Sequence, residues 1–170
     1  IYNEFSFQHE LGFFLRSKLD KRYKVDFERN VSHFDINKDE TIKREIDITI
    51  YTEDQSEKCA IELKYPRNGQ YPEQMFGFIK DIKFMEQLKE RGFLETYCLT
   101  IVDDSNFYVD SGRTTKEIYG YFRENKVITR GEKIKKPTGK DGENSIIELH
   151  SEYQIKWEGD EEKKYYLVRL

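Results

Sequence analysis

The chain has 170 residues, the length of one ordinary domain, so a second complete core is not expected and residues 1–170 are treated as a single domain. Aromatic residues make up 15% of the chain and charged residues 36%, which leaves enough apolar bulk to close a core. The net charge of −4 argues against a protein that coats nucleic acid indiscriminately, because phosphate contacts need clustered lysine and arginine, but it is compatible with a local basic cleft.

Membrane and secretory signals are not visible. No apolar run approaches the roughly 20 residues needed to span a bilayer, and the first ten residues lack the basic region and cleavage site of a secretory signal. Cys59 and Cys98 both fall in apolar, strand-like runs and are expected to be small buried hydrophobic residues rather than a disulfide. The sequence therefore predicts a cytoplasmic protein that does not associate with membranes.

The first part of the chain, up to about residue 102, shows clear periodicity. Apolar residues at helical spacing predict helices over residues 4–20 and 72–91, the second with Pro72 in its first turn. Alternating or continuous apolar runs predict strands over residues 23–34, 42–51, 58–65 and 93–104. Only a short loop, 53–57, separates the second strand from the third, so these two are expected to form a hairpin.

The pattern is weaker from residue 103 onward. A short helix is expected over 114–124, and a charged, glycine-rich loop over 131–144. Further strands are expected over 126–130, 145–157 and 165–170. The predicted fold is thus an α/β domain with an α-β-β-β-α-β core over about residues 4–102. A mixed central sheet is flanked by helices, and the C-terminal residues 103–170 add further strands.

Acidic residues lie inside both apolar strands of the predicted hairpin. Because side chains alternate faces along a strand, Asp47 on one strand and Glu62 and Lys64 on the next share one face. The opposite face carries the apolar residues of the same strands, Ile46, Ile48, Ile50, Cys59, Ile61 and Leu63. We therefore expect the two carboxylates and the lysine to lie within reach of one another.

Two carboxylates beside a lysine have a definite chemical use. Mg²⁺ prefers hard oxygen ligands and is often held by one or two carboxylates, together with water and substrate phosphate. Backbone carbonyls can also ligate, and that of Leu63 lies between Glu62 and Lys64. A bound ion of this kind activates water and stabilises charge on a phosphoryl oxygen, and a nearby lysine can orient that water.

Asp47, followed on the next strand by Glu62-Leu63-Lys64, resembles the D…(D/E)-x-K signature of the PD-(D/E)XK, or restriction-endonuclease-like, nuclease superfamily. The order of the predicted elements over residues 4–102 is similar to the core of that family. The family's first helix often contributes another acid, for which Glu10 is the best match and Glu4 the second. Several branches carry a glutamine at the start of the next helix, a position that Gln74 resembles. Ile46 departs from the proline that often precedes the aspartate.

The resemblance implies a Mg²⁺-dependent nuclease, with Mn²⁺ able to substitute, that hydrolyses nucleic acid and is expected to act on DNA. In this reading Asp47, Glu62, the Leu63 carbonyl and Glu10 hold the metal, and Lys64 positions the attacking water. Gln74 contacts the scissile phosphate or the water. The product carries a 5′-phosphate, and a homodimer that cuts both strands is compatible with the family.

Plainer interpretations stay open. Asp47, Glu62 and Lys64 could form a solvated cross-strand charge cluster, whose ion pairs contribute about 0.2–1 kcal/mol each. Glu10 and Gln74 could be surface residues. The whole protein could be a catalytically inactive nuclease-fold module that binds nucleic acid or protein, or an interaction domain that uses residues 165–170 as an edge strand.

The sequence also contains a dense basic stretch. It lies in the charged loop and consists of Lys133, Lys135, Lys136 and Lys140. A solvated loop is the ordinary interpretation of such a run. Under the nuclease interpretation it is a candidate for gripping backbone phosphates.

Overall fold

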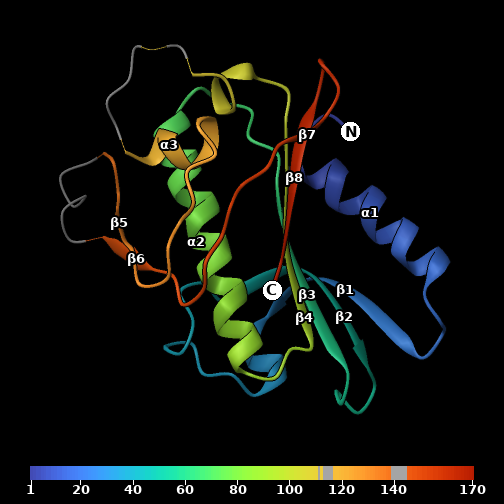
Figure 1. Ribbon diagram of the computed structural model, residues 1–170. Coiled ribbons are helices and arrows are strands. Elements are labelled where there is room, and N and C mark those ends of the chain that lie inside the picture. The colour runs from blue at the N-terminus through green and yellow to red at the C-terminus, as the bar shows by residue number, and fades with distance from the viewer. Residues whose placement is uncertain (111, 113–116, 139–144) are drawn as a thin grey trace.

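The computed structural model describes residues 1–110, 112, 117–138 and 145–170 (Figure 1). Its centre is a six-stranded sheet in the order β1-β2-β3-β4-β8-β7. The strands are β1 (Tyr23–Asn30), β2 (Glu45–Thr52), β3 (Lys58–Lys64), β4 (Glu95–Val102), β7 (Glu158–Gly159) and β8 (Lys164–Arg169). β3 and β4 are parallel, and the other neighbouring pairs are antiparallel. The α/β class and the mixed sheet are as predicted.

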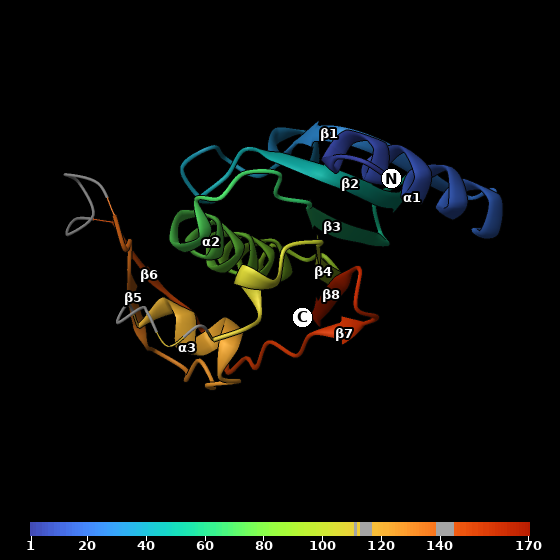
Figure 2. The same cartoon turned by 90° about the horizontal axis from the view of Figure 1, so that it is seen from above.

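Helices cover both faces of this sheet. α1 (Glu4–Lys18) packs over β1, β2 and β3, and α2 (Tyr71–Glu90) packs on the opposite face against β3 and β4 (Figure 2). The outer side of α2 is covered in turn by α3 (Ile118–Arg123) and by a small hairpin of β5 (Lys133–Lys135) and β6 (Ile146–Glu148). Among the described helices, none combines the length and apolar composition that crossing a bilayer requires.

Two apolar clusters hold these layers together. The larger cluster lies on the α2 side of the sheet. Most of the buried residues of α2 belong to it, among them Phe78, Ile79, Ile82 and Met85. On the α1 side a smaller cluster consists of Phe7, Val25, Ile48, Ile61 and Leu63. Because α2 is enclosed between the sheet and the C-terminal segments, it buries side chains on more than one stripe, including the charged residues Asp81 and Glu86.

Helix α1 lies very close to β1. Its start is fixed by a capping box in which the Asn3 side chain accepts the Ser6 N–H and Ser6 accepts the Asn3 N–H. Two turns further on, Gly12 faces the ring of Phe27, and a Cβ at position 12 would lie 2.1 Å from the ring atom Cζ. Glycine therefore allows this close approach of helix and sheet, and any larger residue would force the Phe27 ring or the helix to move.

Several predicted boundaries were wrong. The strand predicted over 23–34 ends at Asn30, because the chain turns into a 3₁₀ helix, η1 (Val31–Phe34), whose first turn is capped by the Asn30 side chain. The strand predicted over 42–51 begins only at Glu45. Phe14, one of the apolar residues at helical spacing on which the prediction of the first helix depends, is 55% exposed, since the inward row of α1 runs through Gln8 and Gly12.

The C-terminal part differs most from its prediction. The charged loop of 131–144 contains strand β5, and of the strand predicted over 145–157 only β6 is regular. Residues 126–130 form one isolated bridge, between Ile128 and Tyr153. The predicted helix of 114–124 is α3, which begins at Ile118; residues 113–116 and 139–144 lie outside the described residues.

Candidate active site

The site is built where β2 and β3 separate. The two strands pair from Tyr51–Lys58 to Ile48–Ile61, and the next two residues, Asp47 and Glu62, lie beyond the paired part. Their side chains replace the missing backbone ladder. Asp47 Oδ2 accepts the Leu63 N–H at 2.7 Å, and Glu62 Oε1 lies 3.4 Å from the Asp47 backbone nitrogen that donates to it. Each acid is thus fixed by the backbone of the neighbouring strand.

The expected alternation of faces holds on β3 and breaks on β2. Ile61 and Leu63 pack on the α1 side, whereas Glu62 points to the α2 side, as predicted. On β2, Ile48 packs on the α1 side but Ile46 joins the apolar cluster on the α2 side. The reason lies in β1, where Glu28 adopts a left-handed conformation with φ 48° and the regular pairing opposite Asp47 is interrupted.

Three carboxylates and two lysines meet at this place and are called the charged cluster: Asp47, Glu62, Asp81, Lys43 and Lys64. The Lys43 ammonium contacts Glu62 Oε2 and donates to Asp81 Oδ1 at 2.9 Å. Lys64 Nζ lies 3.8 Å from Asp81 Oδ2 and donates to the Leu63 carbonyl at 2.8 Å. The side chains of Glu62 and Asp81 are only 1% and 5% exposed. The structure therefore brings the predicted Asp47, Glu62 and Lys64 together.

The acid from α1 is Glu4, not Glu10. Glu4 Oε1 lies 3.3 Å from Lys64 Nζ, and Glu4 Oε2 accepts the Tyr65 N–H at 3.1 Å. Glu10 is exposed, and its nearest described charge partner is His9 at 3.9 Å. Residues four apart share one helix face, so Glu4 lies on the inward row with Gln8, while Glu10, two residues on from Gln8, points elsewhere.

The predicted glutamine of α2 is also outside the charged cluster. Gln74 donates to the Asn68 side chain at 2.9 Å, and none of the described contacts joins it to the carboxylates. Another glutamine does reach the site. Gln8, buried on α1, donates both to the Asp47 carbonyl at 2.8 Å and to Glu28 at 2.6 Å, so it ties α1 to the strand that carries Asp47.

The electrostatics of the charged cluster follow from its burial. Burial raises the pKa of Asp47 to about 6, against the opposing effects of Lys64, the Leu63 N–H and Lys43. Burial, and then the charges of Asp47 and Asp81, also raise the pKa of Glu62 above its ordinary range, although the Lys43 ion pair opposes this. The carboxylates are therefore crowded with like charge, and each added cation lowers the cost of ionising them.

Both lysines are held in the charged form. Burial alone would lower the pKa of Lys64, yet Asp81, Asp47 and Glu4 raise it to about 12. Lys43 behaves in the same way, since Asp81 and Glu62 raise its pKa above the ordinary value despite its burial. At neutral pH Lys64 is consequently an ammonium group that donates hydrogen bonds and does not accept a proton.

Solvent reaches the charged cluster through one side. An open pocket of about 510 Å³ is lined by Asp47 and Lys43 of the cluster, together with Glu28, Ile42, Arg44, Glu45 and Lys80. Three of these residues are cationic and three are acidic. Asp47 is therefore not sealed behind apolar packing and can be reached by a polar ligand from this pocket.

The residues present fit a small divalent cation. Within the described part of the chain, no three His, Cys, Asp or Glu side chains are arranged as a complete metal site. Mg²⁺, however, needs only one or two carboxylates and completes its octahedron with water and phosphate oxygens. Asp47, Glu62 and the Leu63 carbonyl supply hard oxygens at one place. In addition, the buried Asp81 Oδ2 has no hydrogen-bond partner among the described atoms and only the more distant Lys64 ammonium, at 3.8 Å, as an ion-pair partner.

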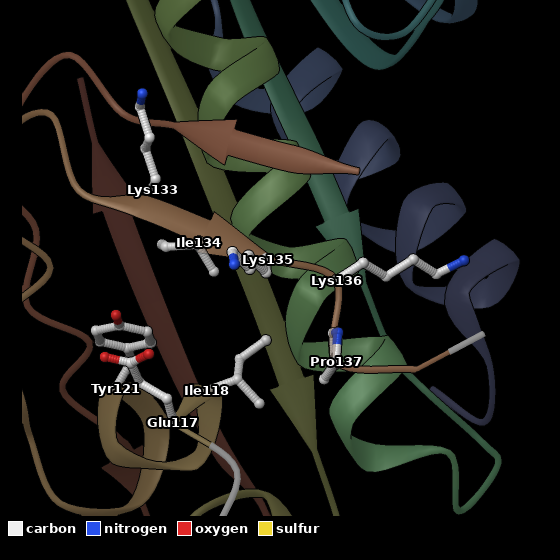
Figure 3. A pocket seen from close by; sticks show the side chains of 8 residues that line it. All are labelled: Glu117, Ile118, Tyr121, Lys133, Ile134, Lys135, Lys136 and Pro137. Carbon is white, nitrogen blue, oxygen red and sulfur yellow. The ribbon is translucent and has the colours of Figure 1, made fainter. Parts of the chain in front are cut away.

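The basic stretch lies elsewhere. Lys133, Lys135 and Lys136 line a pocket of about 340 Å³ with residues of α3, among them Ile118 and Tyr121. Figure 3 shows Lys133 and Lys136 extending in different directions from β5 and the segment after it. None of the described contacts joins these lysines to the charged cluster, and Lys140 lies outside the described residues. Their role in holding phosphates stays a prediction.

Sequence reasoning missed Asp81 and Lys43. Asp81 carried a usable signal, because it stands three residues after Phe78 and four before Met85, which places an acid on the apolar stripe of the predicted helix. Lys43 carried none, since it fell at the polar start of a predicted strand.

No family model, no curated protein and no solved structure matches this chain. The charged cluster and the order of the elements that carry it are therefore the features that bear on function.

Proposed function

We propose that the protein is a metal-dependent nuclease that hydrolyses phosphodiester bonds of DNA with Mg²⁺, for which Mn²⁺ substitutes. One observation carries the proposal: at the point where β2 and β3 separate, Asp47, Glu62 and Lys64 converge beside a solvent-open pocket. A solvated surface cluster does not explain a Glu62 side chain that is 1% exposed.

The order of the elements supports a restriction-endonuclease-like core. The chain runs α1-β1-β2-β3-α2-β4, with Asp47 on the second strand and Glu62 and Lys64 on the third. β3 and β4 are parallel and are joined by α2, while β1, β2 and β3 are antiparallel. This is the arrangement that the resemblance to the PD-(D/E)XK superfamily implies.

Each residue has a role in this proposal. Asp47, Glu62 and the Leu63 carbonyl would hold the cation, which would lower the pKa of a bound water and stabilise charge on a phosphoryl oxygen. Glu4 and Asp81 flank the Lys64 ammonium and fix its position. Since its pKa is about 12, Lys64 orients water or phosphate by donating hydrogen bonds, and the proton of the attacking water passes to solvent.

The overall reaction is hydrolysis. The oxygen of one water forms a bond to phosphorus as the bond from phosphorus to the 3′ oxygen breaks. The departing oxygen takes a proton from solvent, which leaves a 3′-hydroxyl and a 5′-phosphate. The pocket beside Asp47 is the proposed entrance for the phosphodiester.

Plasmid cleavage tests the proposal. Supercoiled plasmid is incubated with Mg²⁺ or Mn²⁺ and the wild type, Asp47→Ala or Lys64→Ala. The control is Glu53→Ala, which removes an exposed acid at the opposite end of the same hairpin. We expect cleavage by the wild type and the control, and loss of at least about 100-fold in rate for the two cluster variants.

The alternative outcome is equally specific. If the wild type leaves the plasmid intact in both metals, or if the cluster variants cut as fast as the control, the catalytic proposal fails. DNA binding retained in that case, measured by fluorescence anisotropy, favours the inactive nuclease-fold module.

A further inference from the structure

Lys43 holds the place of a cation at the candidate metal site. It lies in the segment before β2, outside the Asp47, Glu62 and Lys64 pattern. Its ammonium contacts Glu62 Oε2 and donates to Asp81 Oδ1 at 2.9 Å, so one positive charge joins the two most buried carboxylates of the charged cluster. The aromatic ring of Phe84 lies on its other side, 5.6 Å from Nζ.

The contact to Glu62 excludes a second cation on the same oxygen. A divalent ion bound by Glu62 Oε2 would lie within a few ångströms of the Lys43 ammonium, and two cations so close in a poorly hydrated place repel strongly. Glu62 Oε1 is engaged as well, since it accepts the Asp47 N–H at 3.4 Å. A metal bound by Glu62 therefore competes with the Lys43 ammonium for the same carboxylate.

An open pocket next to Lys43 gives its side chain room to move away from Glu62. Its side chain is 22% exposed and lines the pocket of about 510 Å³ that also reaches Asp47. Asp81 can keep its contact with Lys64, at 3.8 Å, when Lys43 leaves. The ammonium can consequently move into the pocket without leaving all of the buried carboxylates unpaired.

We infer that Lys43 is a positioning residue that acts as the resident cation of the site: it holds Glu62 and Asp81 together in the metal-free protein and competes with the divalent cation for Glu62. This inference rests on the proposed metal-dependent function. It assigns to Lys43 control over metal affinity, a property that a merely structural ion pair does not have.

Calorimetric titration with Mn²⁺ tests the competition. Lys43→Met keeps the length of the side chain but removes its charge, and Lys43→Arg keeps the charge. The matched control is Lys80→Met, which removes a lysine from the same pocket. We expect Lys43→Met to bind Mn²⁺ about tenfold more tightly than the wild type. Lys43→Arg and Lys80→Met should stay close to the wild type.

Thermal unfolding supplies a second readout. Without metal, Lys43→Met should melt at a lower temperature than the wild type, because Glu62 and Asp81 lose their shared partner. With saturating Mn²⁺ its melting temperature should rise by more than that of the wild type. A structural role alone would lower the first value without enlarging the second.

A measurement on the wild type covers the case in which Lys43→Met does not fold. The side-chain ammonium signal of an ion-paired lysine is observable in ¹H–¹⁵N spectra, and the Lys43 signal should weaken or disappear as diamagnetic Mg²⁺ is added. A Lys43 signal unaffected by saturating Mg²⁺, or a Lys43→Met variant that binds Mn²⁺ no more tightly, overturns the inference.

The two proposals fail separately. Wild-type protein that cuts plasmid and binds Mn²⁺ through Asp47, together with unchanged affinity in Lys43→Met, removes the role of Lys43 and leaves the nuclease proposal standing. Wild-type protein that neither cuts plasmid nor binds Mn²⁺ removes both.

Discussion

Helix α2 buries two carboxylates, Asp81 and Glu86, less than two turns apart, and their surroundings differ. Glu86 accepts hydrogen bonds from the backbone of His150 and Ser151 and from the Tyr153 hydroxyl, at 2.8–2.9 Å. Asp81 meets two lysines and two other carboxylates, and its Oδ2 atom has no hydrogen-bond partner among the described atoms. Both side chains are about 5% exposed, so burial alone does not separate them.

The difference lies in how each charge is compensated. Glu86 also has an ammonium partner, Lys83 Nζ at 3.4 Å, but its backbone N–H donors cannot move away, so Glu86 is a fixed anchor that joins α2 to the segment after β6. Lysine side chains can move, and the charge they balance can be taken over by another cation. A buried acid satisfied by backbone donors therefore indicates structure, whereas buried acids balanced by mobile ammonium groups indicate a site.

The strongest test of the structural half of this comparison is Glu86→Ala. The substitution leaves two backbone N–H groups and the Tyr153 hydroxyl without their acceptor, and we expect it to lower the free energy of unfolding by about 3–5 kcal/mol. Glu86→Gln keeps an acceptor and should cost less. Urea denaturation measures both; a loss below about 1 kcal/mol for Glu86→Ala would contradict the anchoring role.

In contrast to Glu86, removal of the charge of Asp47 in the charged cluster should stabilise the protein at neutral pH. The pKa of Asp47 is raised from 3.8 to about 6, so the folded protein binds this proton more tightly than the unfolded chain. The stabilisation is complete below about pH 4 and is lost as the pH rises through about 6. Asp47→Asn should hence change little below pH 4 and increase the free energy of unfolding above pH 6, by up to about 2–3 kcal/mol.

A control of opposite sign is available in the loop of the same hairpin. Hydrogen bonds from Thr52 and Ser56 lower the pKa of Asp54 to about 2. Its stabilisation is present above about pH 4 and is lost as the pH falls through about 2, so Asp54→Asn should destabilise the protein at neutral pH. Unfolding curves from pH 3 to pH 8 compare the two variants. If Asp47→Asn also destabilises the protein at pH 7, the crowding of charge in the cluster is refuted.

The smallest expected effect distinguishes the two acids of α1. Glu4→Gln weakens the contacts with Lys64 and the Tyr65 N–H, in a partly exposed position, and should cost about 1 kcal/mol or less. It should also slow plasmid cleavage, because Lys64 loses one of its two flanking acids. Glu10→Gln should leave both properties unchanged. Equal effects of the two substitutions would mean that α1 contributes no specific acid to the site.

The hairpin and its three functional residues could be predicted because the information is local. Alternation along β3 places Glu62 on the face opposite Ile61 and Leu63, and the short loop makes β2 and β3 neighbours. The second helix was equally visible in its apolar spacing. Even so, the place of Ile46 was missed, because it depends on the left-handed Glu28 of another strand.

The parts that escaped prediction depend on contacts between distant segments. Strands β5 and β6 have three residues each and exist only because they pair with one another against α2. Lys43 is 19 residues from Glu62 and 38 from Asp81 in the chain, and nothing near it indicates either partner. Glu4 could have been preferred to Glu10 only if the inward row of α1 had been recognised from Gln8 and Gly12, two residues without large apolar side chains.

Gly12 is the point at which α1 meets the Phe27 ring of β1. Glu4 precedes it by eight residues, roughly 12 Å along the helix axis. A Cβ at position 12 would lie 2.1 Å from Phe27 Cζ, so either the Phe27 ring or the helix would have to shift. The N-terminal end of α1 carries Glu4, the acid that contacts Lys64. A shift of α1 caused by one methyl group at position 12 would change the alignment of the Lys64 ammonium group without removing or adding any charge.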